Sequence, residues 1–284
     1  MTAIGMRAFI RALCTIIAAH LTVLLPPSRT EASDKLRLQL MWTHQAQFAG
    51  IYVAVSKGYY AREGIDLEII EGGPGIAPIE RLRTADADVA LAWLPAALAA
   101  RLQGHDVVNI AQIFRHPGIA IVCRRGPGLQ SPADVSGKTI GVWNTGDELQ
   151  VRYWLRTLGI SRDSVRIVQQ RSDALDLIER RVDCATAMMY NEYWSILQSG
   201  LSPGELFHVR FADSQQGFLD DGIYVNAETL QDKQRHQALV RFLRATLAGW
   251  QYARENPEEA LAITMASAPG VDAAHQRRML QSVL

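Results

Sequence analysis

Two kinds of hydrophobic pattern follow one another along the first half of the chain. Apolar residues alternate with polar ones in Leu36–Leu40 and again in Ile65–Ile70, which predicts two β-strands. Between them, apolar residues of Phe48–Val55 recur at helical spacing. A third short strand is predicted at Val89–Trp93, followed by an alanine-rich helix. Strands that alternate with helices are typical of a mainly parallel sheet covered by helices.

The alternation of predicted strands and helices is interrupted once and then resumes. Glycines and prolines interrupt Arg124–Asp134, which we interpret as the first crossing into a second lobe. Three further strands are predicted beyond it, at Lys138–Val142, Val165–Gln169 and Cys184–Met188. The pattern also predicts earlier strands at Val107–Phe114 and Ile119–Cys123, and later strands leading back to the first lobe at Leu206–Phe211 and Ile223–Val225.

We therefore predict an α/β protein of two lobes with a ligand cleft between them, the organisation of a bilobed binding protein. Residues 33–124 form the first part of lobe 1, residues 125–212 form lobe 2, and residues 213–284 return to lobe 1 and add the last helices. Two lobes joined by two crossings close on a ligand by hinge motion. The helical pattern runs to Leu284 without a stop signal, which leaves open whether the sequence is truncated there.

The first 32 residues are predicted to be a signal peptide. Arg7 and Arg11 give a positive start, and Ala12–Leu25 is apolar but short for a membrane span. Small residues at Thr30 and Ala32 predict cleavage after Ala32. The mature protein is then expected in the periplasm; the alternative is an N-terminal membrane anchor that stays attached.

Composition excludes several classes of function. The 284 residues have a formal net charge of +0 and no basic stripe, so we expect no nucleic-acid partner. The three cysteines, Cys14, Cys123 and Cys184, have no metal-ligand spacing, so we expect no metal and no cofactor. We expect Cys123 and Cys184 to be buried free thiols, with a disulfide as the alternative in an oxidising compartment.

Candidate binding residues gather in the loop Trp42–Gly50. It follows a predicted strand, and ligands of open α/β sheets lie outside the carboxyl ends of the strands. Trp42 offers a flat aromatic surface, while His44, Gln45 and Gln47 can donate or accept hydrogen bonds. This set suits a planar, polar heterocycle. The alternative is that Trp42 belongs to the core and the amides are solvated.

The chain resembles substrate-binding proteins of ABC importers, of the thiamine-pyrimidine-precursor and riboflavin-binding (SsuA/THI5-like) type. The likeness spans roughly Lys35 to Ala266. The motifs that carry it are Trp42–Ala54, Lys57–Tyr60, Glu63–Asp66, Glu71–Pro74, Gly141–Trp143, Tyr190–Tyr193 and Asp220–Val225. The resemblance implies a type II periplasmic binding protein. Such a protein would be a monomeric, non-enzymatic receptor that delivers a small heteroaromatic ligand to a permease and an ATPase.

It also implies roles for individual residues. Trp42 would stack on the ring, Gln45 and Gln47 would orient its polar edges, and Trp143 would approach from the second lobe. Tyr190 offers a second stacking face, and Asn191 and Glu192 follow a strand, where a carboxylate can accept from a ring N–H. Three further residues have alternative interpretations. Trp93 faces the cleft or the core, and Glu148 contacts the ligand or caps a helix. Asp221 reaches the ligand, shapes the hinge or belongs to a solvated acidic pair.

More than one ligand and more than one class of function are compatible with the sequence. The later motifs favour a riboflavin-like ligand, and a thiamine pyrimidine precursor, hydroxymethylpyrimidine or formylaminopyrimidine, is the alternative. A sensory input domain of a signalling protein is another. An enzyme is a third, because relatives in eukaryotes make the thiamine pyrimidine with a protein histidine and an iron-binding cysteine cluster. The two cysteines after residue 32 lie far apart, which argues against that cluster.

Overall fold

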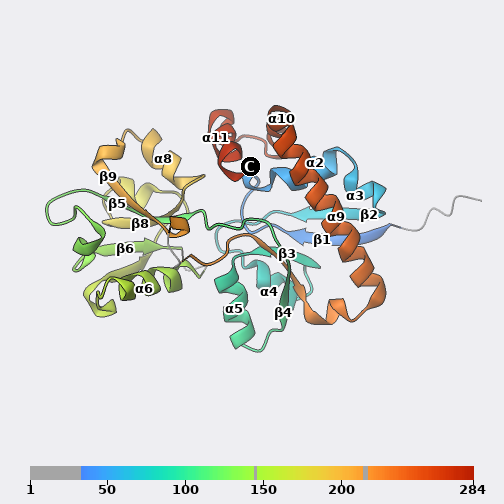
Figure 1. Ribbon diagram of the computed structural model, residues 1–284, viewed down its shortest axis with the longest axis horizontal. Coiled ribbons are helices and arrows are strands. Elements are labelled where there is room, and N and C mark those ends of the chain that lie inside the picture. The colour runs from blue at the N-terminus through green and yellow to red at the C-terminus, as the bar shows by residue number, and fades with distance from the viewer. Residues whose placement is uncertain (1–32, 144–145, 214–216) are drawn as a thin grey trace, which may run out of the picture. The chain divides into compact units, whose positions relative to one another are not determined.

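A computed structural model describes residues 33–143, 146–213 and 217–284, and within them the strands form two five-stranded sheets (Figure 1). The predicted signal peptide, residues 1–32, lies outside the described residues. Each sheet, with the helices that cover it, is here called a lobe. Among the described residues, no helix combines the length and hydropathy needed to cross a bilayer.

The first lobe is built on a sheet with the strand order β2-β1-β3-β10-β4. Its strands are β1 (Asp34–Gln39), β2 (Ile65–Ile70), β3 (Val89–Ala92), β4 (Val107–Gln112) and β10 (Gly222–Asn226). β1 pairs in parallel with β2 and β3, whereas β10 lies antiparallel between β3 and β4. The carboxyl ends of β1 and β3 therefore open onto the same edge of the sheet, as the sequence pattern predicts.

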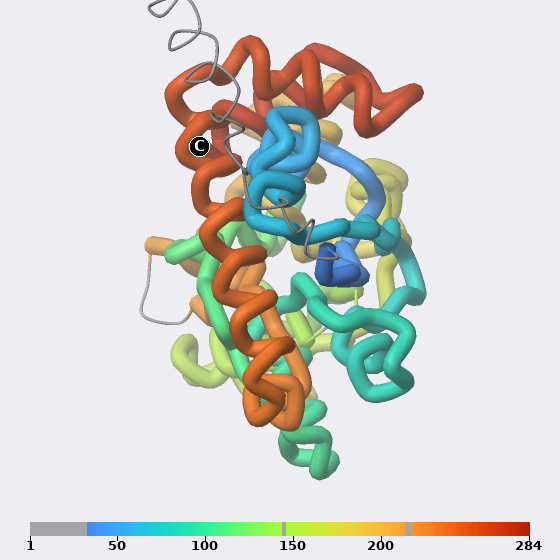
Figure 2. Tube along the Cα trace, turned by 90° about the vertical axis from the view of Figure 1, so that its right-hand side faces the viewer, coloured from blue at the N-terminus to red at the C-terminus, as the bar shows by residue number. Residues whose placement is uncertain are grey.

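Helices from both ends of the sequence cover this sheet. They are η1 (Ala46–Phe48), α2 (Ala49–Ser56), α3 (Tyr59–Arg62), α4 (Pro78–Arg83), α5 (Leu94–Leu102), η6 (Ala227–Leu230), α9 (Lys233–Glu255), α10 (Pro257–Ser267) and α11 (Ala273–Val283). The long α9, orange-red in Figures 1 and 2, packs against α2. A Cβ atom on Gly249 of α9 would lie only 2.0 Å from the Gly50 carbonyl oxygen, so these helices approach at their glycines.

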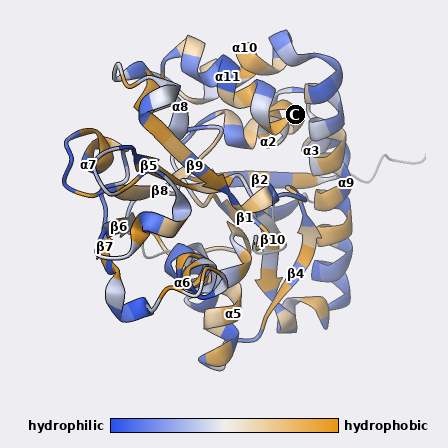
Figure 3. Cartoon of the chain, turned by 60° about the vertical axis from the view of Figure 1, so that its left-hand side comes forward, coloured by the Kyte–Doolittle hydropathy of each residue, from blue (hydrophilic) through white to orange (hydrophobic). Residues whose placement is uncertain are grey.

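Burial follows the alternation seen in the sequence. Leu38 and Leu40 are fully buried and pack with Phe48 and Phe242, which joins β1 to the helices above it. Along α9, hydrophilic and hydrophobic residues form alternating bands (Figure 3), as expected for a helix with one face on the core.

The second lobe has the strand order β7-β6-β8-β5-β9. Its strands are β5 (Ile119–Arg124), β6 (Thr139–Val142), β7 (Arg166–Gln169), β8 (Cys184–Met188) and β9 (Leu206–Arg210). Its helices are η2 (Pro132–Val135), α6 (Asp147–Thr157), η3 (Arg162–Ser164), α7 (Leu175–Ile178), α8 (Glu192–Gln198), η4 (Pro203–Glu205) and η5 (Phe211–Asp213). β6 is parallel to β7 and β8, and β5 is antiparallel to β8 and β9.

The strand pairing differs from the expected first crossing. The sequence pattern put Ile119–Cys123 in the first lobe, yet β5 pairs with β8 and β9 of the second sheet, so the chain crosses between Gln112 and Ile119. The Gly- and Pro-rich segment after β5 only forms a local turn, in which Gly126 bridges Leu129. β9 also stays in the second sheet, and β10 alone of the two later strands returns to the first.

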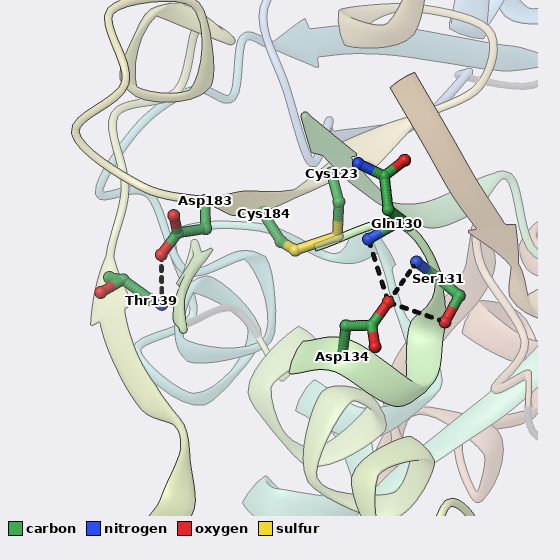
Figure 4. The surroundings of a disulfide bond; sticks show 7 residues. All are labelled: Cys123, Gln130, Ser131, Asp134, Thr139, Asp183 and Cys184. Atoms are coloured by element: carbon green, nitrogen blue, oxygen red, sulfur yellow. Dashed lines mark hydrogen bonds between the residues drawn. A yellow bond between two sulfur atoms is a disulfide. The ribbon is translucent and has the colours of Figure 1, made fainter. Parts of the chain in front are cut away.

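The expectation of free thiols was wrong, because Cys123 and Cys184 form a disulfide (Figure 4). The two residues are direct partners in the antiparallel pairing of β5 and β8, although 61 positions separate them in sequence. Both are fully buried. Only the pairing of the two strands reveals the bond, and neither strand's own pattern carries that information.

Candidate functional site

A cavity of about 130 Å³ lies between the ends of strands from both lobes. The first lobe contributes Met41, Trp42, Gln45, Gln47, Gly73, Pro74, Gly75, Ile76, Pro78, Ala92, Trp93 and Ala96. The second contributes Trp143, Gln169, Gln170, Ser172, Met188, Tyr190, Asn191 and Glu192. Most of these residues lie at the last position of β1, β2, β3, β6, β7 or β8 or within six residues after it, so the strand ends and the loops that follow them build the walls.

Backbone contacts hold the Trp42 loop in place. The Gly72 N–H donates to the Trp42 carbonyl oxygen at 3.1 Å. A Cβ atom on Gly72 would lie 2.3 Å from the Leu40 carbonyl oxygen, so glycine is needed at this crossing of two loops. The His44 N–H donates to Glu71 Oε1 at 3.1 Å, and the Ala46 N–H donates to Gln276 Oε1 of α11 at 2.7 Å.

A buried carboxylate behind the cavity orients the polar side chains of the first lobe. Asp221 Oδ2 accepts from Gln47 Nε2 at 2.7 Å, and Asp221 Oδ1 accepts from Trp93 Nε1 at 3.2 Å. Gln47 Oε1 in turn accepts from Gln45 Nε2 at 2.6 Å. Because a carboxylate only accepts, Asp221 fixes which end of each amide donates. Burial raises the pKa of Asp221 to about 7, although the donors from Gln47 and Trp93 lower it.

The second lobe contributes the only carboxylate among the described residues that line the cavity, Glu192. It is 6% exposed and begins α8. Its Oε2 accepts from the Met188 N–H at 3.0 Å, and its Oε1 accepts from Asn191 Nδ2 at 2.7 Å. Burial raises the pKa of Glu192 to about 7, while these two donors favour the ionised form.

Aromatic side chains meet across the two lobes. Trp93 and Trp143 have ring centroids 6.1 Å apart and planes tilted by 51°. Burial raises the pKa of the Tyr190 phenol well above its ordinary value, so that side chain stays neutral. Trp143 Nε1 and Gln170 Oε1, both on cavity-lining residues, have no hydrogen-bond partner within the described part of the chain. The cavity thus has aromatic walls, and two of its lining side chains carry a buried polar atom without a partner among the described residues.

Positive charge is missing from the described lining residues, which include no lysine, arginine or histidine. Two further acids lie just behind them, Asp221 and Asp220. Burial and the neighbouring Asp221 raise the pKa of Asp220 well above its ordinary value. The described residues also contain no cluster of His, Cys, Asp and Glu suited to a metal ion. The electrostatic environment disfavours an anion and suits a neutral or cationic group.

The structure brings eight of the eleven candidate residues to the cavity wall, and their role as ligand contacts stays a prediction. They are Trp42, Gln45, Gln47, Trp93, Trp143, Tyr190, Asn191 and Glu192. The two interpretations of Trp93 are both partly met, because the side chain is 9% exposed and lines the cavity.

Three candidates do not line the cavity. Asp221 lies behind Gln47 and Trp93, which take both of its oxygens. The His44 ring is hydrogen-bonded through Nδ1 to the Tyr52 hydroxyl at 2.9 Å, because the helical turn that follows brings Tyr52 beneath the loop. Glu148 Oε2 accepts from the Gly146 N–H at 3.2 Å at the start of α6, which matches the capping interpretation.

Sequence reasoning missed several lining residues: Met41, Ile76, Pro78, Ala92, Ala96, Gln169, Gln170, Ser172 and Met188. Gly73, Pro74 and Gly75, in the loop after β2, also line the cavity. Gln169 and Gln170 carried a usable signal, because they end a predicted parallel strand and then leave it as polar residues.

Residues 45–260 match the family model described as NMT1/THI5 like. The chain belongs to this family. The resemblance inferred from the motifs is thereby confirmed, and the match includes every described lining residue except Met41 and Trp42.

Curated proteins that are similar in sequence to this chain include binding proteins and enzymes. A formylaminopyrimidine-binding protein of Halalkalibacterium halodurans is 24% identical over 240 residues, 84% of this chain and 72% of that protein. The riboflavin-binding protein RibY of Chloroflexus aurantiacus is 26% identical over 279 residues, 95% of this chain and 78% of its own. A 4-amino-5-hydroxymethyl-2-methylpyrimidine phosphate synthase of Legionella pneumophila is 26% identical over 242 residues, with coverages of 83% and 74%.

Solved structures establish the fold. The periplasmic aliphatic sulphonate binding protein SsuA of Escherichia coli superposes with a TM-score of 0.69 at 14% identity, covering 87% of this chain and 78% of its own. The periplasmic nitrate-binding protein NrtA of Synechocystis gives a TM-score of 0.66 at 15% identity, with coverages of 86% and 69%. The NMT1/THI5-like chain therefore has the fold of periplasmic binding proteins, as its sequence pattern predicts.

Proposed function

We propose that this chain is the receptor of an ABC importer and that its cleft captures a single-ring, unphosphorylated heterocycle of the aminopyrimidine class. The observation that carries the proposal is the cavity itself: about 130 Å³, aromatic walls from both lobes, and one buried carboxylate with no opposing cation among the described lining residues.

Size favours one ring over three. An apolar cavity of about 150 Å³ in a protein core holds a benzene molecule. The cavity between these lobes, about 130 Å³, is of the same order, so its size suits a substituted pyrimidine. The sequence motifs favoured a riboflavin-like ligand, and a tricyclic flavin needs a substantially longer slot. The formylaminopyrimidine-binding relative supports the single-ring assignment.

Charge favours a ligand without phosphate. A phosphate would carry negative charge into a site where the carboxyl groups of Glu192, Asp221 and Asp220 are all buried. Proteins bind such groups with arginine, lysine or free backbone N–H groups. An amino group on a pyrimidine, in contrast, can donate to the Glu192 carboxylate, and hydrogen bonds to a charged acceptor are the stronger ones.

A receptor is favoured over an enzyme by the placement of His44. The synthase alternative needs a reactive histidine facing the substrate. His44, whose ring contacts the Tyr52 hydroxyl, is not among the residues that line the cavity. As a receptor, the protein would act with a permease and an ATPase. We also expect export to the periplasm through residues 1–32 and a monomer in solution.

Riboflavin is the second candidate ligand, because the RibY relative aligns with 95% of this chain. A fluorescence titration separates the two. Protein exported by cells and purified from the periplasm is titrated with formylaminopyrimidine, hydroxymethylpyrimidine, its phosphate and riboflavin. The proposal predicts saturable quenching of tryptophan by the first two, and binding of the phosphate at least about tenfold weaker.

Each of the other outcomes would contradict a different part of the proposal. Saturation by riboflavin alone would replace the pyrimidine by a flavin. Equal affinity for the phosphate would contradict the charge argument, and a chemically altered ligand recovered after incubation would make the protein an enzyme. No response to any of the four compounds would refute the ligand class.

A further inference from the structure

Helix α11 reaches the binding carboxylate through a chain of hydrogen bonds. His275, in the first turn of α11, lies with its Nε2 2.7 Å from Asn191 Oδ1. Asn191 Nδ2 then donates to Glu192 Oε1 at 2.7 Å. Figures 1 and 3 show α11 between α10 and α8, which places this contact where the two lobes adjoin. His275 itself is not among the residues that line the cavity.

The direction of this chain follows from the chemistry of its members. Ionised Glu192 only accepts, so the Asn191 amide nitrogen must face it and the Asn191 carbonyl oxygen must face His275. His275 Nε2 therefore carries a proton and donates. The Asn191 side chain makes no capping hydrogen bond at the start of α8, so helix capping does not fix its orientation.

α11 also contacts the other wall of the cavity. Gln276, the next residue, is 4% exposed and accepts the Ala46 N–H on the Trp42 loop at 2.7 Å. One turn further, the Arg278 guanidinium lies 5.9 Å from the centre of the Trp194 ring on α8. Adjacent residues of one helix thus support both sides of the cleft. Asp272 fixes the start of that helix by accepting the His275 N–H at 2.7 Å.

We propose that His275 is a positioning residue for ligand recognition: it orients Asn191, and Asn191 in turn holds the Glu192 carboxylate as an acceptor for a ligand N–H. The choice of ligand rests on the function proposed above. The orientation of Glu192 by His275 does not, because it concerns hydrogen bonds within the protein alone.

Protonation of His275 does not break the chain. Burial lowers its pKa, Arg278 lowers it further, and Asp272 raises it. Both the imidazolium and the neutral ring with its proton on Nε2 donate to Asn191. A glutamine at this position also ends in an N–H donor. H275Q should therefore keep the function, whereas H275A and H275M, which cannot donate, should lose it.

The first test needs no ligand. Carboxyl-carbon NMR of 13C-glutamate-labelled full-length protein follows the titration of Glu192, with the resonance assigned by its loss in E192Q. In H275A and H275M we expect the Glu192 titration midpoint to rise by roughly 0.5 pH unit, because an unanchored Asn191 no longer stabilises the carboxylate. H275Q should match the wild type. An unchanged midpoint in both H275A and H275M would overturn the proposal.

The chain offers a matched control. His105 Nε2 lies 2.9 Å from Asn226 Oδ1, the same pair of groups, in the first lobe and among residues that do not line the cavity. H105A removes an equivalent bond and should leave the Glu192 titration unchanged. A shift of the same size in H105A would show a general effect of losing a His–Asn bond and would overturn the specific role of His275.

The second test measures specificity with two probes, formylaminopyrimidine and its analogue with a methyl group in place of the ring amine. We expect H275A and H275M to reduce the wild-type preference for the amine about fivefold or more, as expected for a weakened bond to a charged acceptor. N191A should produce the same loss, and N191A/H275A should add nothing to it. Equal weakening of both probes would show a merely structural helix contact and contradict the proposal. If the wild type binds neither probe, the proposed function fails, and the NMR titration still decides the role of His275.

Discussion

Single side chains of the first lobe are expected to supply much of the affinity. Trp42 lines the cavity at the carboxyl end of β1, where its ring can stack on a heterocycle. We predict that W42A weakens binding by about 1–3 kcal/mol, the range found for bases stacked on aromatic side chains. Y153A, at an exposed tyrosine on α6, is the control and should bind normally. Calorimetric titration provides both affinities, and equal values would remove Trp42 from the site.

The ionisation of Glu192 should make binding depend on pH. Its pKa is raised to about 7 by burial, so the accepting carboxylate forms as the pH rises through that value. For a ligand that donates an N–H, we predict an affinity roughly tenfold higher at pH 8 than at pH 6, the ratio of the ionised fractions. E192Q should bind more weakly at pH 8 and lose this pH dependence. An affinity that falls between pH 6 and pH 8 in the wild type would contradict the assigned role.

The sequence predicted which loop residues reach the cavity better than it predicted the orientation of their side chains. Trp42, Gln45 and Gln47 follow a strand, and the rule on strand ends was enough to bring them to the cavity. His44 belongs to the same loop, yet its ring turns to Tyr52, eight positions later. Rotations within a loop depend on the helix below it. No local pattern encodes them.

At the scale of elements, the cross-strand disulfide should stabilise the second lobe. Cys123 and Cys184 join β5 to β8 across a separation of 61 residues. Closing a loop of this length restricts the unfolded chain, and we predict that C123A/C184A lowers the free energy of unfolding by about 2–4 kcal/mol. Urea denaturation measures the difference. Wild-type protein with a reducing agent should match the double variant, and an oxidised wild type with two alkylatable thiols would exclude the bond.

Strands and helices with strong periodicity were predicted close to where they lie, as with β1, β2 and β6. Membership of a sheet was not. β5 looks like the continuation of the first lobe, because its own apolar run, Ile119–Cys123, does not indicate which sheet it joins. Its assignment depends on pairing with β8, some sixty residues later, and that same pairing creates the disulfide. Both errors therefore have one cause, which is the non-local nature of sheet pairing.

At the scale of the whole binding unit, closure of the lobes should control affinity. Gly146, at the start of α6, has φ +105°, and a Cβ atom there would lie 2.7 Å from Pro95 Cβ on α5 of the other lobe. We predict that G146V obstructs this contact and weakens ligand binding at least about tenfold. Small-angle scattering should show a larger radius of gyration in the presence of ligand than for the wild type.

Gly159 supplies the control for backbone strain. It also has a positive φ, +69°, but a Cβ atom there meets nothing within 4 Å. G159V therefore tests the conformational cost without the contact between lobes, and it should bind ligand like the wild type. If G146V and G159V lose affinity equally, strain rather than closure explains the loss. The two-lobe arrangement was predicted from the restart of the strand and helix rhythm, whereas such interlobe contacts required the structure.

One geometric feature is central to the proposed function: a single ring lies between the aromatic walls and donates an N–H to Glu192. A crystal structure of the protein with formylaminopyrimidine tests it most directly. We predict the ring in the cavity beside Trp42 and Trp143, with its amino nitrogen about 3 Å from a Glu192 carboxylate oxygen. A ring bound outside this cavity, or inside it with Glu192 out of hydrogen-bond reach, would contradict the account.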